Sequence, residues 1–259
     1  MPTLQSHLDA VVAALAVVAP TDLVWPAGLM NPGGPHRRLK GMISPISIGD
    51  DECLVFGRII EGLRPAHVFV IGNAFGFSAA YIGRVMEEHG GVSLVTLDSQ
   101  SEGDGAKCAQ VAQRLADQLG LRLLVSKKGS SPEDVPTAVA AAVHDLVFID
   151  GMHVSPYVTN DLNATLPYAN ERTVFVWHDY WTNGVSDGVT VARRKGFRCL
   201  FLPTSCEMVI GARDPDVFAS LQRLFPDANE TPFPHGRFDE TKVVTATLVN
   251  FLWRKLRRG

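Results

Sequence analysis

Short apolar runs alternate with helical stretches through the middle of the 259-residue sequence, and this alternation restricts the fold more than any other feature. An apolar run of roughly four to eight residues is typical of a buried strand, whereas apolar residues three or four apart indicate a helix. Strands that are connected through helices pair in parallel and need helices on both faces of the sheet. The sequence predicts such strands at residues 67–72, 92–98, 121–126, 145–150 and 173–179.

A predicted helix follows each of these strands, and a further helix precedes the first strand. The apolar spacing places the helices at residues 48–62, 78–88, 104–119, 132–142, 156–166 and 186–195. In a sheet of this kind, ligands bind at the carboxyl ends of the strands. Polar residues at the ends of the predicted strands are therefore the first candidates for a functional site.

The alternation stops after residue 196. Two strand-like runs, FRCLFL and CEMVIGA, are separated only by Pro203, Thr204 and Ser205. This link is too short for a helical crossover but long enough for a hairpin. We therefore expect an α/β fold with a Rossmann-like, doubly wound and mostly parallel sheet of seven strands, which ends in an antiparallel hairpin.

Two extensions flank the predicted core at residues 46–212. Residues 1–45 contain an apolar helix and, at 25–45, a loop rich in proline and glycine, which is either a lid over the site or a disordered connection. Residues 213–259 form a proline-containing segment followed by a terminal helix with a basic end. The apolar faces of the two terminal helices suggest a homodimer.

Composition and charge exclude several classes of partner. The formal net charge is −3 and the isoelectric point is about 6.2, so nothing attracts the whole chain to nucleic acid or to anionic lipid. No apolar stretch reaches the roughly 18 residues that cross a bilayer. The four cysteines form no CxxC pair, which favours free thiols in a reducing compartment. We expect a cytoplasmic protein that binds neither membrane nor nucleic acid.

The stretch VIGNAFGFS predicts a ligand loop between the first strand and its helix. Gly72 and Gly76 would let the backbone approach a ligand closely, although a glycine pair can also serve only a tight turn. Asp98 ends the second strand, where a carboxylate can accept hydrogen bonds from both ribose hydroxyls. Ser130 and Ser131 follow the third strand and are candidates to lie beside an adenine, while Ser131 before a proline is also a good helix cap. The glycine spacing is not GxGxxG, which argues against a nicotinamide or flavin cofactor.

Two acidic residues and two histidines follow the fourth and fifth strands. Asp150 and His153 come from DLVFIDGMHV, and His178 and Asp179 come from VWHDYW. The ends of neighbouring parallel strands open onto one crevice, so these side chains could share a divalent cation. Oxygen ligands alone would suit Mg²⁺, and imidazole ligands would favour Mn²⁺, Fe²⁺ or Zn²⁺. The alternative is structural: Asp150 caps the next turn, and each histidine is a hydrogen-bonded core residue.

Residues 40–212 resemble the class I S-adenosylmethionine-dependent methyltransferases, and within them the small-molecule O-methyltransferase group of macrolide-sugar and catechol-type enzymes. The strongest local matches are GMISP, VIGNAFGFSAAYIG, VTLD, DLVFIDGMH and VWHDYW. Val70 stands where this family usually has an acidic residue, and Ala74 stands where it has a second glycine. The resemblance implies that S-adenosylmethionine is surrounded by Gly72, Asn73, Phe75, Gly76 and Asp98.

The resemblance also implies roles at the chemical site. Asp150, His178 and Asp179 match positions that hold a divalent metal, and His153 matches a base in the sugar-modifying branch. The implied reaction is methyl transfer to a hydroxyl of a small molecule of secondary metabolism, such as a sugar or a phenol. A catalytically silent protein that binds an adenosine ligand and serves assembly or regulation is the alternative.

Overall fold

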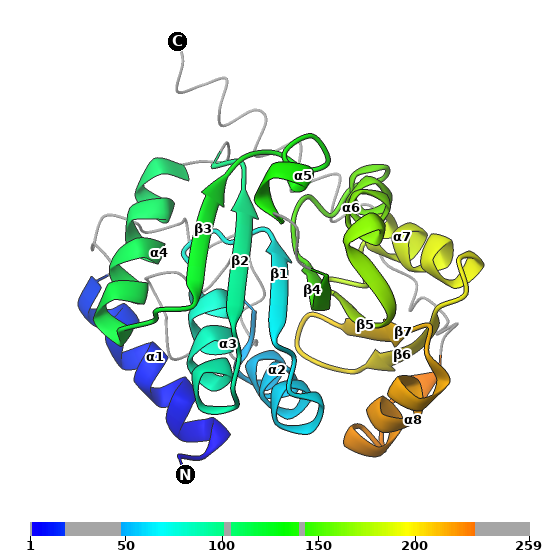
Figure 1. The fold of residues 1–259 in the computed structure, drawn as a ribbon, viewed down its shortest axis with the longest axis horizontal. Coiled ribbons are helices and arrows are strands. Elements are labelled where there is room, and N and C mark those ends of the chain that lie inside the picture. The colour runs from blue at the N-terminus through cyan, green and yellow to red at the C-terminus, as the bar shows by residue number, and fades with distance from the viewer. Residues whose placement is uncertain (1, 19–47, 101–104, 140–142, 231–259) are drawn as a thin grey trace.

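The computed structural model describes residues 2–18, 48–100, 105–139 and 143–230, and it is built around one twisted sheet (Figure 1). In this part of the chain the sheet has eight strands in the order β3-β2-β1-β4-β5-β7-β6-β8. The strands are β1 (His67–Ile71), β2 (Ser93–Asp98), β3 (Leu124–Lys128), β4 (His144–Ile149), β5 (Ala169–Trp177), β6 (Arg198–Leu202), β7 (Met208–Ala212) and β8 (Asn229–Glu230).

The pairing of the strands confirms the predicted topology. Strands β1 to β5 pair in parallel, and β7 inserts between β5 and β6 and is antiparallel to both. The β6–β7 hairpin is therefore the predicted one. The edge strand β8 pairs with β6 and was not predicted, because two residues are too few to carry a hydrophobic pattern.

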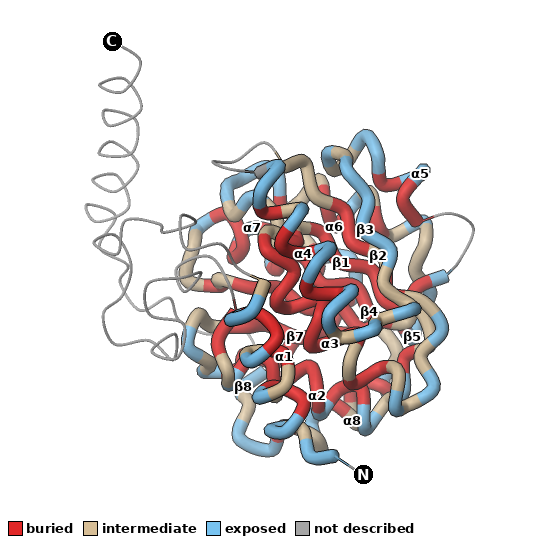
Figure 2. The backbone as a smooth tube through the Cα atoms, turned by 90° about the vertical axis from the view of Figure 1, so that its left-hand side faces the viewer, coloured by how far each residue is buried: buried red, intermediate tan, exposed pale blue. Residues whose placement is uncertain are grey.

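Helices cover both faces of the sheet. One face packs against α1, α2, α3, α4 and α8, and the other packs against α5, α6 and α7. Figure 2 shows buried strands between these two layers. The helices are α1 (Leu4–Val18), α2 (Asp50–Leu63), α3 (Phe77–Glu88), α4 (Gly105–Leu119), α5 (Val135–Ala138), α6 (Tyr157–Thr165), α7 (Asn183–Arg194) and α8 (Pro215–Leu224), with a 3₁₀ turn at Leu166–Tyr168.

The central strands divide their side chains between the two layers. In β1, Val68 and Val70 belong to the core under α1–α4 and α8, whereas Phe69 and Ile71 belong to the core under α5–α7. Successive residues of a strand point to opposite faces, so a strand covered on both sides must be apolar throughout. Each fully buried aliphatic or aromatic side chain contributes about 1.5–3 kcal/mol. This arrangement explains why the strands read as continuous apolar runs.

Two helices differ from the expectation, and β3 begins three residues later than predicted, at Leu124. The segment predicted as a proline-containing excursion includes α8, whose first turn is capped by Asp214 Oδ1 accepting from the backbone N–H groups of Asp216 and Val217. Pro215 occupies the first position of this helix, where its missing N–H has no cost. Helix α5 is shorter than predicted and begins after Asp134, so Ser131 is not its cap. The predicted loop at 25–45 and the terminal helix lie outside the described residues.

His144, at the start of β4, should make the free energy of unfolding depend on pH. Its side chain is buried, its ring stacks on Phe69, and neither ring nitrogen has a hydrogen-bond partner among the described residues. Burial, reinforced by the charge of His67, lowers the pKa of His144 to about 4. At pH values between about 4 and about 6.5, His144 is therefore mostly protonated in the unfolded chain but mostly neutral in the folded chain.

We therefore expect acidification from pH 7 to pH 4 to remove about 3 kcal/mol of unfolding free energy through His144 alone. His144→Phe keeps a stacked ring but cannot be protonated, so this variant should lose about 3 kcal/mol less than wild type over the same interval. Urea titrations of both proteins at the two pH values measure the difference. Parallel losses in the two proteins would show that His144 does not carry this linkage.

Candidate active site

The four predicted side chains at the ends of β4 and β5 lie in contact with one another. Asp150 directly follows β4, and His178 and Asp179 directly follow β5. His153 Nδ1 lies 2.8 Å from Asp179 Oδ2, and His178 Nδ1 lies 2.9 Å from Asp150 Oδ1. His153 Nε2 is 3.3 Å from Asp150 Oδ1, and His178 Nδ1 is 3.4 Å from Asp179 Oδ2. Both imidazoles therefore bridge the same two carboxylates.

Backbone geometry brings these side chains together. The N–H of Asp150 donates to the carbonyl of Ile71, and the N–H of His178 donates to the carbonyl of Ile149, so the ladder continues just past the strands. Asp179 has a φ of 58°, a left-handed conformation that non-glycine residues rarely adopt. Its Oδ1 accepts from the indole N–H of Trp181 at 2.8 Å. Strain of this kind at a cluster of ionisable groups is typical of functional sites.

The loop that carries His153 is pressed against α7. A Cβ added at Gly184 would lie 2.5 Å from the carbonyl oxygen of His153 and 2.5 Å from the amide nitrogen of Ser155. Only glycine allows this approach at the start of α7. Gly184 therefore contributes to the placement of His153, although nothing in its sequence context predicted that role.

The electrostatics of the cluster favour four charged groups. Burial alone would raise the pKa of Asp150 and of Asp179, but the neighbouring imidazoles lower both below their usual range. Burial alone would lower the pKa of His153, but the two carboxylates raise it to about 9, and they also raise the pKa of His178. At neutral pH, and without another cation, both imidazoles therefore hold a second proton.

Two buried nitrogens make this cluster fit a metal ion. His178 Nδ1 and His153 Nε2 are close to Asp150 Oδ1, yet neither has a partner in hydrogen-bond geometry among the described residues. One ligand atom from each of the three residues lies within 4.8 Å of the others. Imidazole nitrogens together with a carboxylate oxygen suit Mn²⁺, Fe²⁺ or Zn²⁺ better than Mg²⁺.

The loop after β1 is organised by Asp98. One of its carboxylate oxygens, Oδ2, accepts from the backbone N–H groups of Asn73 and Ala74, at 2.8 and 2.9 Å, and Oδ1 accepts from Gln100. Gly72 has a φ of 89°, and a Cβ there would collide with the carbonyl of Asp150. Because Gly72 has no side chain, the predicted cofactor loop can lie directly against the backbone of Asp150 in the chemical cluster.

Gly76 has a second reason to be glycine, which the sequence did not show. Gly76 has a φ of 78°, and an added Cβ would lie 2.7 Å from Ala112 Cβ on α4. The backbone conformation and the packing against α4 therefore both favour glycine here. Ala74 has a φ of 40°, so the position where the resembling family has glycine does adopt a left-handed conformation here.

The other predicted cofactor residues differ in how far they are buried and in their hydrogen bonds. The side chain of Phe75 is buried in the core beneath α1–α4 and α8. Asn73 Oδ1 and Ser131 Oγ are buried atoms without hydrogen-bond partners among the described residues, and such atoms suit a polar ligand. Ser130 is exposed, and its N–H donates to Asp134 Oδ2.

Comparison with known proteins agrees with this geometry. Residues 69–180 match the family described as Methyltransferase domain, which covers both the loop after β1 and the four-residue cluster. The sequence of these residues is therefore similar to that of a methyltransferase domain. A search among curated protein sequences gives no match.

Solved structures share the fold of the methyltransferase domain at low identity. A Podospora anserina methyltransferase with bound S-adenosylhomocysteine (SAH) has a TM-score of 0.60 and 12% identity, over 79% of this chain and 87% of its own. The Streptomyces achromogenes O-methyltransferase TomG, in complex with S-adenosylmethionine (SAM), has a TM-score of 0.56 and 16% identity, over 77% and 88%. A Bacillus cereus O-methyltransferase in complex with SAH has a TM-score of 0.55 and 16% identity, over 82% and 92%.

Glu52, on the first turn of α2, joins the cluster from outside the matched residues 69–180 and was missed by the sequence analysis. Its side chain is fully buried, and its Oε2 lies 3.1 Å from His178 Nε2. In the sequence it reads as an acidic residue in the first turn of an amphipathic helix, where such residues are common. Only the structure shows that this turn lies over the ends of β4 and β5.

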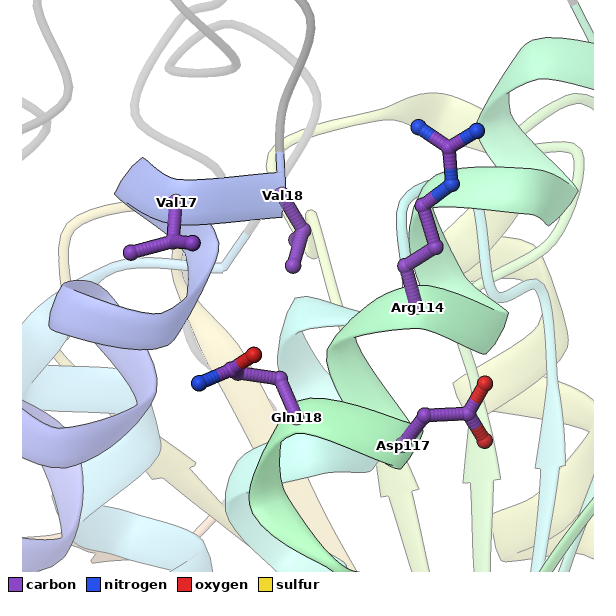
Figure 3. Close-up of a pocket in the computed structure, with 5 residues that line it drawn as sticks. All are labelled: Val17, Val18, Arg114, Asp117 and Gln118. Atoms are coloured by element: carbon purple, nitrogen blue, oxygen red, sulfur yellow. The ribbon is translucent and has the colours of Figure 1, made fainter.

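A separate pocket of about 390 Å³ lies between α1 and α4 (Figure 3). Its lining contains no residue of the predicted cofactor or metal sites. The pocket therefore gives no support to a role in methyl transfer. Its lining residues are Val17, Val18, Arg114, Asp117 and Gln118.

Proposed function

We propose that the chain transfers the methyl group of SAM to a hydroxyl of a small molecule, with assistance from a divalent metal. The observation that carries this proposal is the partly buried cluster of Asp150, His153, His178 and Asp179, with two unpartnered imidazole nitrogens, next to the loop after β1. Titratable groups in such a position, at the carboxyl ends of parallel strands, are suited to proton transfer. A sugar or phenol acceptor, a homodimer and a cytoplasmic location remain predictions.

The proposed cofactor site extends along the ends of β1, β2 and β3. Asp98 binds the ribose hydroxyls and at the same time holds the loop at Asn73 and Ala74. Asn73 Oδ1 accepts from the methionine end of the ligand, and Ser131 Oγ lies beside the adenine. The remaining proposed contacts come from Gly72, Phe75, Gly76 and Ser130.

The proposed chemical site divides its residues between two roles. Asp150, His178 and Asp179 would hold a divalent cation, which when bound lowers the pKa of the acceptor hydroxyl. His153 removes the hydroxyl proton through Nε2, while Asp179, 2.8 Å from Nδ1, fixes the ring and stabilises the imidazolium. His153 accepts this proton only when a cation shares the negative charge of the two carboxylates, because its pKa is otherwise about 9. The products are a methyl ether and SAH.

The catalytically silent alternative makes the same binding predictions but a different kinetic one. SAM and SAH should stabilise the protein against heat in both cases, by mass action on the folded state. Methyl transfer from labelled SAM to a panel of phenols and sugars, with Mn²⁺ or Zn²⁺ added, then distinguishes the two. Binding without any turnover on the panel would favour the silent protein, and binding of neither ligand would refute both.

Asp98→Ala should weaken SAH binding by about 1–3 kcal/mol, because it removes a charged acceptor of hydrogen bonds from the ribose hydroxyls and from the N–H groups of the loop. Isothermal calorimetry with SAH measures the change. Asp117→Ala is the matched control, since Asp117 is an exposed carboxylate that lines the remote pocket. Unchanged SAH affinity in Asp98→Ala would remove Asp98 from the site.

A further inference from the structure

Glu52 is a buried carboxylate with four hydrogen-bond donors. The backbone N–H of Gly49 donates to Oε2 at 2.7 Å, and the backbone N–H of Cys206 donates to Oε1 at 3.0 Å. The hydroxyl of Thr204 also donates to Oε1, at 2.9 Å, and His178 Nε2 lies 3.1 Å from Oε2. Burial of a charge is costly unless it is paired and hydrogen-bonded. Glu52 meets that condition, so it is held firmly in one position.

The contact with His178 determines where that ring carries a proton. An ionised carboxylate can only accept hydrogen bonds, so the contact with Glu52 is a hydrogen bond when His178 carries a proton on Nε2. The two backbone N–H groups and the hydroxyl that donate to its carboxylate stabilise the ionised form of Glu52. When the ring loses its second proton, His178 Nδ1 is then the nitrogen that offers a lone pair to a cation. This same Nδ1 is buried, lacks a hydrogen-bond partner and lies 2.9 Å from Asp150 Oδ1.

We propose that Glu52 is a positioning residue, which holds His178 with its proton on Nε2 and so presents Nδ1 as a metal ligand beside Asp150. The inference rests on the metal assistance of the proposed function. Histidines that bind metals commonly donate their second ring N–H to a carboxylate, which fixes the orientation and the tautomer of the ring. Glu52 occupies that place here, from a helix that precedes the methyltransferase domain.

The neighbouring residue Asp51 provides a matched control. Its carboxylate accepts from the N–H and from the hydroxyl of Ser205, each at 2.8 Å. Asp51 and Glu52 thus hold the same loop between β6 and β7, but the contact to His178 comes from Glu52. A general loosening of this loop should appear in variants of either residue, whereas a change in His178 should appear in variants of Glu52.

The experiment compares Glu52→Gln and Asp51→Asn with wild type. The glutamine amide can donate to His178 Nε2, which moves the ring proton to Nδ1 and blocks ligation there. Calorimetric titration with Mn²⁺ and with Zn²⁺ should show a 10- to 100-fold loss of affinity in Glu52→Gln, in the range known for such outer residues. Asp51→Asn should bind both metals as wild type does.

Nitrogen NMR of the histidines gives a readout that is independent of metal affinity and of turnover. In metal-free wild type, at a pH where the imidazole is neutral, His178 should carry its proton on Nε2, and in Glu52→Gln it should carry it on Nδ1. The same tautomer in both proteins would overturn the proposal, as would equal losses of metal affinity in the two variants. Should Glu52→Gln fail to fold, a wild-type spectrum with the proton on Nδ1 would overturn it alone.

The two proposals can fail separately. If wild type binds neither Mn²⁺ nor Zn²⁺, the metal assistance of the proposed function is refuted, and with it the ligand role of Nδ1. The tautomer shift in Glu52→Gln would still support Glu52 as the residue that sets the protonation of His178. If wild type binds metal but the Glu52→Gln variant binds it equally well, the metal role stands and the positioning role is refuted.

Discussion

His153→Ala should slow methyl transfer by about 10²- to 10⁴-fold, the range expected when a positioned proton acceptor is removed. The affinities for SAH and for Mn²⁺ or Zn²⁺ should stay near those of wild type, because the variant leaves Asp98, Asp150 and His178 unchanged. Single-turnover kinetics with labelled SAM measure the chemical step, and calorimetry measures the two affinities. His89→Ala is the control, since His89 caps the far end of α3.

The geometry also shows which results would contradict the role of His153 as the base. His153 Nε2 lies 3.3 Å from Asp150 Oδ1 and has no hydrogen-bond partner among the described residues, so it is placed for either role. If His153→Ala loses metal affinity together with turnover, His153 is a ligand and not the base. Full turnover in the variant would exclude both roles. If His153 is the base, the acid limb of the wild-type pH profile should disappear or move in the variant, because protonation of the imidazole ends its function.

Removal of the metal should have an effect of similar size. A bound cation contributes several kcal/mol to the stabilisation of developing charge, so exhaustive chelation should reduce turnover at least about 10²-fold. Asp150→Asn should reduce turnover and metal affinity together, because it removes the charged oxygen that lies between the two imidazoles. Rates after chelation, and after restoration with Mn²⁺, Zn²⁺ or Mg²⁺, provide the measurement.

An exposed carboxylate serves as the control for this substitution. Asp187 lies on α7 and is exposed, so Asp187→Asn should leave both the rate and the metal response unchanged. Wild-type turnover that survives exhaustive chelation would refute the metal role outright. In that case the Asp150 carboxylate would act on the histidines alone.

The sheet could be predicted because its central strands are buried on both faces and therefore read as unbroken apolar runs. The β6–β7 hairpin was predictable from the shortness of its link, since three residues cannot cross over the sheet. Helix α8 was not predicted, because the prolines of the segment after residue 212 were taken as a sign of irregular structure, although a first-turn proline such as Pro215 is compatible with a helix. No helix among the described residues is long and apolar enough to cross a bilayer.

The candidate site was predictable to the extent that its residues follow strands. Asp150, His153, His178 and Asp179 lie at or just beyond the ends of β4 and β5, and parallel pairing brings such positions together. Glu52 was not predictable in this way, because its place depends on the packing of α2 over the sheet. The packing of Gly76 against Ala112 was hidden for the same reason, since it joins two helices that the sequence pattern does not orient.

The tie between α2 and the β6–β7 loop has a consequence for the order of events in folding. Glu52 contacts His178, which lies 126 residues further along the sequence. It also contacts Thr204 and Cys206, which lie 152 and 154 residues further along. Contacts of such long range form slowly, because the entropy of closing the chain is lost before they contribute. During synthesis, the sheet from β1 to β5 can assemble while the hairpin is still inside the ribosome. We expect Glu52 to lack two of its hydrogen-bond donors, Thr204 and Cys206, until residue 206 emerges, so that its carboxylate is fixed against His178 only in the last stage of folding.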